Sequence, residues 1–236
     1  SLGSTGIGFL DTLSAVVQKL TGAVLRQVSE NDVTIVWNLR LPRVLLAFLA
    51  GGALSCSGAV VQSVLKNPLA SPFTLGVSAG AAFGAGIVIV TGFTVPFLGN
   101  FVLPATGLIF GVGTVFLGVT FASRVDRNMS GSTIVLAGMV FSLFVDAMLM
   151  VLSSLHHESV QRIVLWQMGS FAMRGWSYVE AFLPFFLVGT LAVLFFSREL
   201  DLLTFGEEQA EAIGVDAPKI KWVLLILSAV LAGSAV

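Results

Sequence analysis

The sequence predicts an all-α fold, a polytopic membrane helix bundle with about six spans plus part of a seventh. Two observations carry this prediction. Only 11% of the 236 residues are charged, whereas 56% are hydrophobic and the mean hydropathy is +0.97. A soluble domain covers its core with charged side chains, roughly a quarter of all residues, and this chain lacks them. The apolar residues also gather into runs of about 20, the length that crosses a bilayer.

The spans are expected at residues 44–65, 75–90, 101–121, 133–152 and 179–196. Turn residues that include Pro96 and Gly99 separate the second run from the third. Residues 222–236 are apolar too, but we expect them to form an incomplete span. The chain is therefore expected to be an interior piece of a larger membrane protein, with a single transmembrane domain over residues 1–236.

The first 43 residues contain no long apolar run, but apolar residues recur there at helical spacing with charged residues between them. This pattern predicts an amphipathic helix that lies on the membrane surface. We expect residues 1–43 to be an external amphipathic segment. The recurring apolar residues are Phe9, Leu10, Leu13, Val17, Leu20, Val24 and Val28.

The loops between the spans sort by charge into two groups. An excess of Lys and Arg in short loops marks the cytoplasmic side of a membrane protein. The cationic group, which is predicted to be cytoplasmic, holds Lys66, Arg124, Arg127, Arg198, Lys219 and Lys221. The other group holds Arg162 and Arg174. The first 43 residues add four cations to the external side, and we give them less weight because that segment is long and its upstream partner is unknown.

Glycines repeat every four residues in two of the predicted spans. Gly76, Gly80 and Gly84 begin one span, and Gly107 and Gly111 lie in the next. Small residues at this spacing allow two helix backbones to approach closely inside a membrane. They predict close packing in a compact bundle. Alternatively, some of these glycines line a pathway or permit helix sliding.

The sequence argues against several classes of function. The net charge of -1 disfavours a nucleic-acid binder. The chain has no G-x-x-x-x-G-K-[ST] phosphate loop, so any ATP hydrolysis requires a separate subunit. The single cysteine, Cys56, and the two neighbouring histidines, His156 and His157, are too few side chains for a metal centre. No arrangement of nucleophile and base argues for catalysis. We therefore expect a membrane protein without a cofactor and without catalytic activity of its own.

Four stretches spread across nearly the whole chain share a pattern with one family. They are RLPR at 40–43; SGAVVQ at 57–62 with NPLASP at 67–72 and LGVSAGA at 75–81; LAG at 136–138 with WQMGSF at 166–171; and GEEQA at 206–210 with IGV at 213–215. In their order and separation they resemble the permease subunits of bacterial ABC importers for iron–siderophore, haem and cobalamin, the FecCD or vitamin B12 permease family.

The resemblance implies a type II ABC importer permease fold, in which this chain begins just after the first span and stops inside the seventh. It implies a protein of the bacterial cytoplasmic (inner) membrane that passes a metal chelate from a binding protein to the cytoplasm by alternating access. The implied partners are an ATPase subunit in two copies, a periplasmic or lipid-anchored binding protein, a second copy of the permease and membrane lipid, with no nucleic acid.

Arg40 and Arg43 flank Pro42 at the predicted head of a span, where proline suits the first turn of a helix. The two cations can simply reach the lipid headgroups. The alternative, implied by the resemblance, is that they pair with carboxylates of the binding protein. A planar guanidinium is suited to that role because it donates two parallel hydrogen bonds.

Two short segments are candidates for a cytoplasmic gate. Asn67, Pro68 and Leu69 lie in a predicted cytoplasmic turn, and Ser132 and Thr133 open the span at 133–152. From the residues alone, a tight turn and two helix-capping hydroxyl groups are sufficient explanations. The resemblance implies that both segments approach the pathway and close it toward the cytoplasm.

Residues 197–221 form a cytoplasmic loop that is too long for a simple helix connection. Thr204 and Glu207 match a T-x-x-E capping box, so a short helix is expected to start there. Gly214 can end it, and Asp216 can cap the next helix with Pro218 in its first turn. The plain interpretation is a solvated surface helix. The resemblance implies a coupling helix that contacts the ATPase through Glu207, Glu208, Gln209, Ala210, Glu211 and Gly214.

Asp146 is an acid in the middle of the span at 133–152 and departs from the family's pattern there. An ionisable residue inside a span usually faces a water-filled path or a partner. Asp146 therefore either lines the pathway or is protonated and bonded to a neighbouring backbone group. His156 and His157 are expected to be surface residues of a loop rather than part of a haem route.

Two competing functions remain to be weighed. An ion-gradient-driven secondary transporter is the main alternative, and it requires several buried ionisable groups at the bilayer midplane, where only Asp146 qualifies. An intramembrane enzyme requires convergent nucleophile and base groups within the spans, and the sequence contains none.

Overall fold

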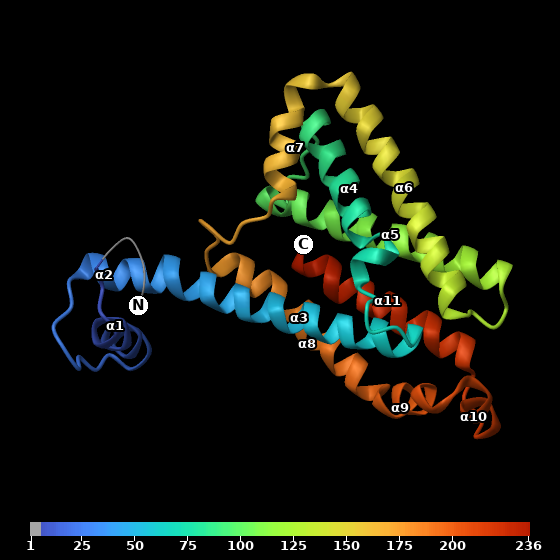
Figure 1. Cartoon of the computed structure of the whole chain (residues 1–236). Helices are drawn as coiled ribbons and strands as arrows, with labels where there is room; N and C mark the ends of the chain where they lie inside the picture. Colours follow the sequence, from blue (N-terminus) through green and yellow to red (C-terminus); the bar gives the residue numbers. More distant parts are fainter. Residues whose placement is uncertain (1–5) are drawn as a thin grey trace. The chain divides into compact units, whose positions relative to one another are not determined.

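The computed structural model describes residues 6–236, apart from the side chain of Glu208. The first five residues of the predicted external segment therefore lie outside the description. Residues 6–236 form helices and turns without strands, which confirms the all-α fold class (Figure 1). The longer elements are α1 Phe9–Thr21, α2 Glu30–Ile35, α3 Leu41–Leu65, α4 Val77–Thr91, α5 Val102–Val125, α6 Gly131–Leu155, α7 Val160–Gln167, α8 Trp176–Phe195, α9 Ser197–Phe205, α10 Glu207–Ala212 and α11 Ala217–Ala235.

Four short elements complete the backbone. A π-helical turn, η1, spans Val36–Arg40, and three 3-10 turns are η2 Pro72–Leu75, η3 Gly99–Phe101 and η4 His157–Ser159. Helix α7 and the turn η4 were not expected from the sequence. They follow α6, and Ile163 of α7 packs against Ala82 of α4 and Leu149 of α6.

Within residues 6–236, five helical segments are long and apolar enough to cross a membrane: Glu30–Leu65, Gly99–Val125, Gly131–Leu155, Trp176–Phe195 and Ala217–Ala235. Helix α4 is a shorter apolar helix of 15 residues. These six segments cover all the predicted apolar runs. The expected count of about six spans plus part of a seventh thus becomes five helices of spanning length and α4.

The described residues form two compact units, one of residues 6–50 and 171–184 and the other of residues 51–170 and 185–236. In the larger unit, α4 packs against α5, α6 and α7, and α11 lies along α5 (Figure 1). The Ser57 hydroxyl of α3 donates to the Ser228 carbonyl of α11 at 2.7 Å, and both residues are buried. This bond satisfies a polar group that lipid cannot solvate.

Glycines make the closest approach of α4 to α5, as the spacing predicts. A Cβ atom on Gly80 would lie 2.4 Å from the Phe110 carbonyl oxygen, and one on Gly111 would lie 2.9 Å from the Val77 carbonyl oxygen. Both distances are too short for a carbon atom, so only glycine permits this packing. Gly76 has a different task, because it has φ 99° and joins the turn η2 to α4.

Helix α11 begins at Ala217, ahead of the apolar run that was expected to form an incomplete span. Its 19 residues reach membrane-spanning length. The expected boundary at Trp222 left out the first turns because they contain Lys219 and Lys221. The predicted cap is confirmed, since the Asp216 carboxylate accepts the Lys219 backbone N–H at 3.1 Å and Pro218 occupies the first turn.

In the smaller unit, α1 ends at Gly22, which has φ 75°. The amphipathic helix is therefore shorter than the apolar pattern, which continues to Val28. A small core contains Ile7, Ala15, Val33 and Val36. Most of the large apolar residues of α1 are exposed instead, namely Phe9, Leu10, Leu13 and Leu20.

Pro42 lies inside a continuous helical segment, Glu30–Leu65, rather than in the first turn of a helix. A proline inside a helix donates no N–H, and its ring collides with the carbonyl group four residues earlier. Just before Pro42, the Leu41 N–H donates to the Val36 carbonyl five residues back. This π-helical turn widens the backbone at the point where the proline needs space.

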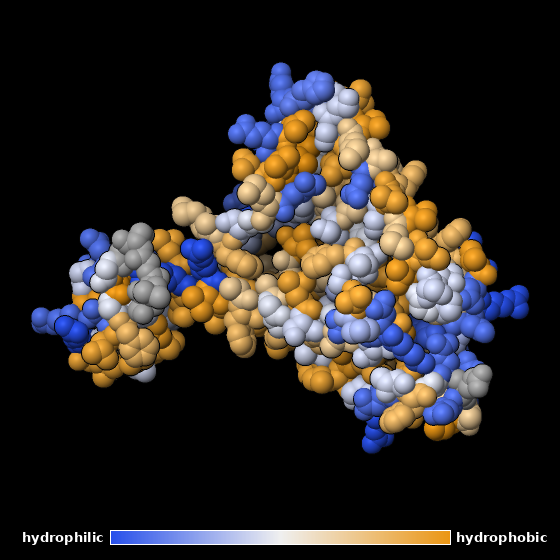
Figure 2. Space-filling model, viewed as in Figure 1, coloured by the Kyte–Doolittle hydropathy of each residue, from blue (hydrophilic) through white to orange (hydrophobic). Residues whose placement is uncertain are grey.

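Figure 2 shows apolar side chains over the outside of α6 and polar side chains around the turn between α6 and α7 and around α9 and α10. The exposed large apolar residues of α6 are Leu136, Met139, Val140, Leu143, Phe144, Met148, Met150, Val151 and Leu155. An apolar surface between polar ends is typical of a protein in a bilayer. These features indicate an integral membrane protein.

Candidate functional site

The short helix α10 stands between two glycines with unusual backbone angles. Gly206 separates it from α9 with φ 140° and ψ 148°, a conformation that is essentially restricted to glycine. Gly214 follows it with φ 94°, and its N–H donates to the Glu211 carbonyl at 2.9 Å. The predicted short helix and its glycine end are therefore confirmed.

The predicted capping box at the start of α10 is wrong. Thr204 lies inside α9, where its hydroxyl donates to the Asp201 carbonyl at 2.6 Å. The N-cap residue of α10 is Gly206, which has no side chain to cap with. Glu207 cannot complete the box because its carboxylate turns to Lys221.

The predicted contact residues of α10 differ in their exposure. Gln209 and Glu211 are exposed, and so is Gly214 beyond the helix. Ala210 is 0% exposed and packs the helix against the rest of the larger unit. The Glu207 side chain is 32% exposed and is ion-paired inside the protein. The side chain of Glu208 lies outside the described residues.

Lys221 is the largest polar side chain in the interior of the larger unit, with an exposure of 1%. Its ammonium group has three N–H donors and three acceptors around it. The Nζ atom lies 2.7 Å from Glu207 Oε1, 3.0 Å from the Met129 carbonyl oxygen and 3.2 Å from the Asn128 carbonyl oxygen. A buried charge is tolerated only when it is paired and hydrogen-bonded, as it is here.

Asp126 fixes the loop that presents those two carbonyl groups. Its Oδ1 atom accepts the Asn128 N–H at 3.0 Å, and its Oδ2 atom accepts the Ser130 N–H at 2.9 Å. Hydrogen bonds from the Ser130 hydroxyl and then from its backbone lower the pKa of Asp126 from 3.8 to about 2. The carboxylate is therefore ionised at neutral pH. Met129 completes the turn with φ 50° and a buried side chain.

The first candidate gate segment is a tight turn at the end of α3. The Asn67 Oδ1 atom accepts the Leu69 N–H at 2.9 Å, and the Asn67 carbonyl accepts the Ala70 N–H at 3.1 Å. Pro68 is exposed, and Leu69 is 87% exposed. These two hydrogen bonds stabilise the turn, which exposes the apolar side chain of Leu69.

The second candidate gate segment lies at the start of α6. Ser130 precedes the helix, and its Oγ atom lies 2.9 Å from Thr133 Oγ1 and 3.4 Å from Ser132 Oγ. A Cβ atom on Gly131 would lie 2.8 Å from the Leu65 carbonyl oxygen. The start of α6 thus lies against the end of α3, directly before the Asn67 turn. The structure brings the two predicted gate segments together.

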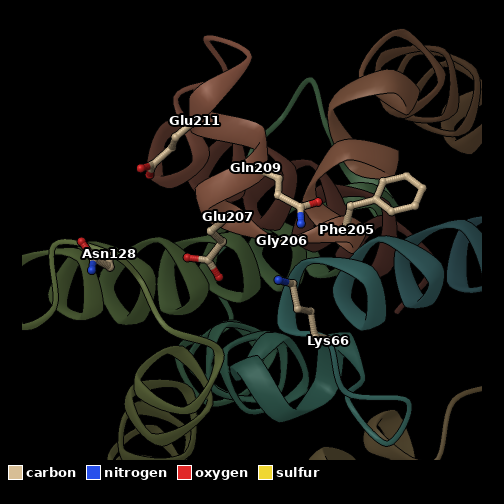
Figure 3. A pocket seen from close by; sticks show the side chains of 7 residues that line it. All are labelled: Lys66, Asn128, Phe205, Gly206, Glu207, Gln209 and Glu211. Carbon is tan, nitrogen blue, oxygen red and sulfur yellow. The ribbon is translucent and has the colours of Figure 1, made fainter.

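A cavity of about 500 Å³ opens beside these elements. Figure 3 shows Lys66 at the end of α3 and Glu207 at the start of α10 pointing toward one another across it. The remaining lining residues are Asn128, Phe205, Gly206, Gln209 and Glu211. The end of α3, the loop before α6 and the start of α10 therefore lie around one hollow.

Asp146 is exposed near the middle of α6, and its carboxylate forms no hydrogen bond with any of residues 6–236. The alternative of a bond to a neighbouring backbone group therefore has no support within this chain. His156 and His157 are exposed at the end of α6, where the His156 Nδ1 atom lies 3.2 Å from the Leu152 carbonyl oxygen. Among the described residues, no group of three His, Cys, Asp or Glu side chains forms a metal site.

Arg40 and Arg43 belong to the smaller unit. Arg40 ends the π-helical turn and is half-buried, whereas Arg43 is exposed one turn later. Next to them in this unit, the Trp176 Nε1–H donates to the Trp37 carbonyl at 2.9 Å, and the two indole rings lie 5.2 Å apart. This hydrogen bond and the ring contact join the π-helical turn to the start of α8.

Sequence reasoning missed the role of Lys221, which it counted only as one of several cytoplasmic cations. One signal was available. Lys221 stands five residues after the capping Asp216, next to Trp222 and ahead of a long apolar run. A lysine there is inside the first turns of a span, and so it needs a partner.

Comparisons with known proteins agree with this architecture. The model of the FecCD transport family matches residues 1–236. A solved structure described as an inward-facing conformation of a metal-chelate type ABC transporter superposes with a TM-score of 0.78 at 31% identity. The match covers 98% of this chain and 73% of that one.

Three curated relatives are similar in sequence. The uncharacterized ABC transporter permease protein YvrB of Bacillus subtilis is 44% identical over 202 residues, which are 86% of this chain and 57% of YvrB. The molybdate import system permease protein MolB of Haemophilus influenzae is 33% identical over 82% of this chain and 56% of MolB. The hemin transport system permease protein HmuU of Yersinia pestis is 34% identical over 100% of this chain and 69% of HmuU.

The chain belongs to the FecCD transport family. It spans somewhat more than half the length of YvrB and MolB. The family match and the helical architecture together support the sequence-based identification. They do not favour the alternative of an ion-gradient-driven secondary transporter.

Proposed function

We propose that the chain is part of the transmembrane permease of an ATP-binding-cassette importer in the bacterial cytoplasmic membrane. It moves a metal chelate, such as an iron–siderophore, haem or a cobalamin-type compound, from an external binding protein to the cytoplasm by alternating access. Two ATPase subunits supply the energy, and a second copy of the permease completes the path. The observation that carries the proposal is the match of the whole chain to the FecCD family.

The side of the membrane on which α10 lies is supported by two independent observations. Short loops rich in Lys and Arg are cytoplasmic in membrane proteins, and that group includes Lys66, Arg124 and Arg127. Lys66, Asn128 and Glu207 also line one cavity, so the loops that contain them share one side. We therefore propose that α10 faces the cytoplasm, where an ATPase subunit binds.

The exposed side chains of α10 are the proposed contact with the ATPase. Gln209 and Glu211 are exposed, line the cavity, and offer an amide group and a negative charge. Glu207 and Ala210 are turned inward and fix the position of the helix. A short helix held on one side and exposed on the other can transmit a rigid-body movement between subunits.

The two candidate gate segments support a closure on the same side. The Asn67 turn and the start of α6, with Ser132 and Thr133, lie next to one another and next to the cavity below α10. We propose that Asn67, Pro68 and Leu69 with Ser132 and Thr133 close the path toward the cytoplasm. Asp146, exposed on α6, is proposed to line the path and to influence which charges pass.

The cargo class rests on the names of the relatives, which refer to hemin and to molybdate. Both are compounds of a metal, and they differ widely in size. A chelate of iron or cobalt remains the proposed cargo, and molybdate is the further compound to test. Arg40 and Arg43, on the proposed external side, are the docking residues for the binding protein.

Co-purification tests the function directly. The full-length protein, extracted in detergent, is expected to bring down an ATPase subunit whose hydrolysis rises when a loaded binding protein is added. Glu211→Arg in α10 is expected to reduce the recovered ATPase about tenfold, since close charge pairs contribute 1.5 kcal/mol or more at interfaces, roughly a factor of ten. The control is Glu158→Arg, an exposed acid in the turn η4. A protein that is soluble without detergent, or that hydrolyses ATP unaided, contradicts the proposal.

A further inference from the structure

The ammonium group of Lys221 connects three separate elements of the larger unit. Lys221 is in α11, Glu207 is the first residue of α10, and Asn128 and Met129 belong to the loop between α5 and α6. The three N–H donors of the lysine match the three acceptors, so each donor has a protein partner. Lys221 itself is 1% exposed, whereas the side chain of its partner Glu207 is 32% exposed.

The loop on one side of Lys221 is held by hydrogen bonds and leads directly into α6. Asp126 holds the backbone N–H groups of Asn128 and Ser130 at 3.0 and 2.9 Å. Met129 is anchored by its buried side chain. A displacement of the two carbonyl groups that Lys221 binds therefore moves Ser130 and the first turn of α6.

The helix on the other side of Lys221 packs mainly against α9 and makes few contacts with α11. Gly206, with φ 140°, joins α10 to α9, and Gly214, with φ 94°, leads toward α11; both have backbone conformations that glycine adopts without strain. Ala210 contributes one buried methyl group. The ion pair of Glu207 with Lys221, at 2.7 Å, therefore fixes the start of α10.

We propose that Lys221 is the joint that passes the movement of α10 to the cytoplasmic gate at the start of α6. A pull on α10 acts through the Glu207 carboxylate on the Lys221 ammonium, and through it on the carbonyl groups of Asn128 and Met129. The first turn of α6, next to the Asn67 turn, then follows. Lys221 is a positioning residue in this scheme, and the inference rests on the proposed coupling function of α10.

If Lys221 only stabilised the fold, an apolar side chain at this position would serve equally well. Replacement of a buried ion pair by packed apolar residues is often neutral or stabilising. The energetic cost of burying Lys221 is therefore a reason to look for a task that needs a charge. Linking the short helix α10 to backbone carbonyl groups is such a task, since only a multiple donor binds all three acceptors at once.

The test uses the full-length protein with its ATPase and binding protein in liposomes. Uptake of a ferric hydroxamate, haem or cyanocobalamin, whichever the wild-type importer carries, is divided by the ATP hydrolysed over the same time. Lys221→Met keeps the length of the side chain and removes the charge. It is expected to lower the cargo moved per ATP roughly tenfold, within the usual range of coupling between sites, while ATP hydrolysis continues.

Two further variants keep the test decisive if Lys221→Met does not fold. Glu207→Gln leaves Lys221 with its two carbonyl acceptors and is expected to lower the cargo per ATP as well. The double variant is expected to lose no more than the worse single one, because both act through one ion pair. The control is Lys219→Met, an exposed lysine in the first turn of the same helix, which should leave the ratio unchanged.

The outcomes separate this inference from the proposed function. If the wild-type protein moves cargo with ATP, and both Lys221→Met and Glu207→Gln keep the wild-type ratio, Lys221 is not the joint. Equal losses of uptake and hydrolysis, or losses that add in the double variant, also overturn it. A wild-type protein that moves no cargo with ATP contradicts the proposed function instead.

Discussion

Arginine and lysine have different environments in this protein, and their environments match different tasks. Lys221 is enclosed and bound by three acceptors, whereas Arg43 is exposed and Arg40 is half-buried at the end of a π-helical turn. The planar guanidinium suits recognition of a carboxylate on another protein. The compact ammonium suits an internal junction. We therefore expect charge reversal at the two arginines to affect an external partner.

Arg40→Glu and Arg43→Glu are each expected to weaken binding of the substrate-binding protein about tenfold and to reduce its salt dependence. The reason is that a like charge replaces an attraction at the proposed interface, where charge pairs are worth at least about 1.5 kcal/mol. The measurement is the affinity of the loaded binding protein for the reconstituted importer at several salt concentrations.

Arg124→Glu is the matched control for the two arginines. Arg124 is exposed at the end of α5, on the proposed cytoplasmic side. Its reversal should leave the affinity unchanged. If Arg40→Glu and Arg43→Glu also leave the affinity and its salt dependence unaltered, the two arginines do not dock the binding protein.

At the scale of elements, the contact between α4 and α5 depends on missing side chains. Gly80 meets the backbone of Phe110 and Gly111, and neither partner can move aside without shifting a helix. In a membrane such close packing replaces the hydrophobic effect as the force between helices. The contact between these helices should therefore be sensitive to one methyl group.

Gly80→Ala is expected to destabilise the protein by about 1–3 kcal/mol, because the new methyl group forces the helices apart. Gly113→Ala is the matched control in α5, since nothing lies within 4 Å of a Cβ atom there. Thermal unfolding in detergent should show a clear decrease for the first variant and none for the second. Equal stability of the two variants would mean that α4 and α5 are not held at this distance.

Much of the helical architecture could be predicted from the sequence because lipid imposes simple rules. The uncharged runs form helices, and Gly80 and Gly111 lie where α4 and α5 make contact. Gly214 follows the end of one helix and Asp216 caps the start of the next, as their residue types suggest. Predictions from local patterns were wrong where a residue distant in the sequence determines the contact. Glu207 has the spacing of a capping residue, but a fully buried lysine 14 residues later takes its carboxylate.

The candidate site was less predictable than the fold. The sequence indicated the Asn67 turn, Ser132 and Thr133, and α10 as separate segments. Their meeting around one cavity depends on how α3, α6 and α10 pack, which no local pattern encodes. Pro42 illustrates the same limit, because its place inside a long helix depends on the π-helical turn before it.

At the scale of the whole molecule, the proposal divides the work between two sides of a membrane. Arg40 and Arg43 are assigned to the external binding protein. The α10 helix, the Lys221 junction and the two gate segments are assigned to the cytoplasmic side. In this proposed division, energy enters from the cytoplasm as ATP hydrolysed by another subunit.

The most direct measurement is uptake of labelled ferric hydroxamate, haem, cyanocobalamin and molybdate by liposomes that contain the full-length protein and its ATPase. We expect one of these compounds to accumulate only when ATP is inside, in the orientation that exposes α10 to it, and a loaded binding protein is outside. Accumulation should persist when ionophores abolish the ion gradients. Uptake that needs a proton or sodium gradient and no ATP would contradict the account.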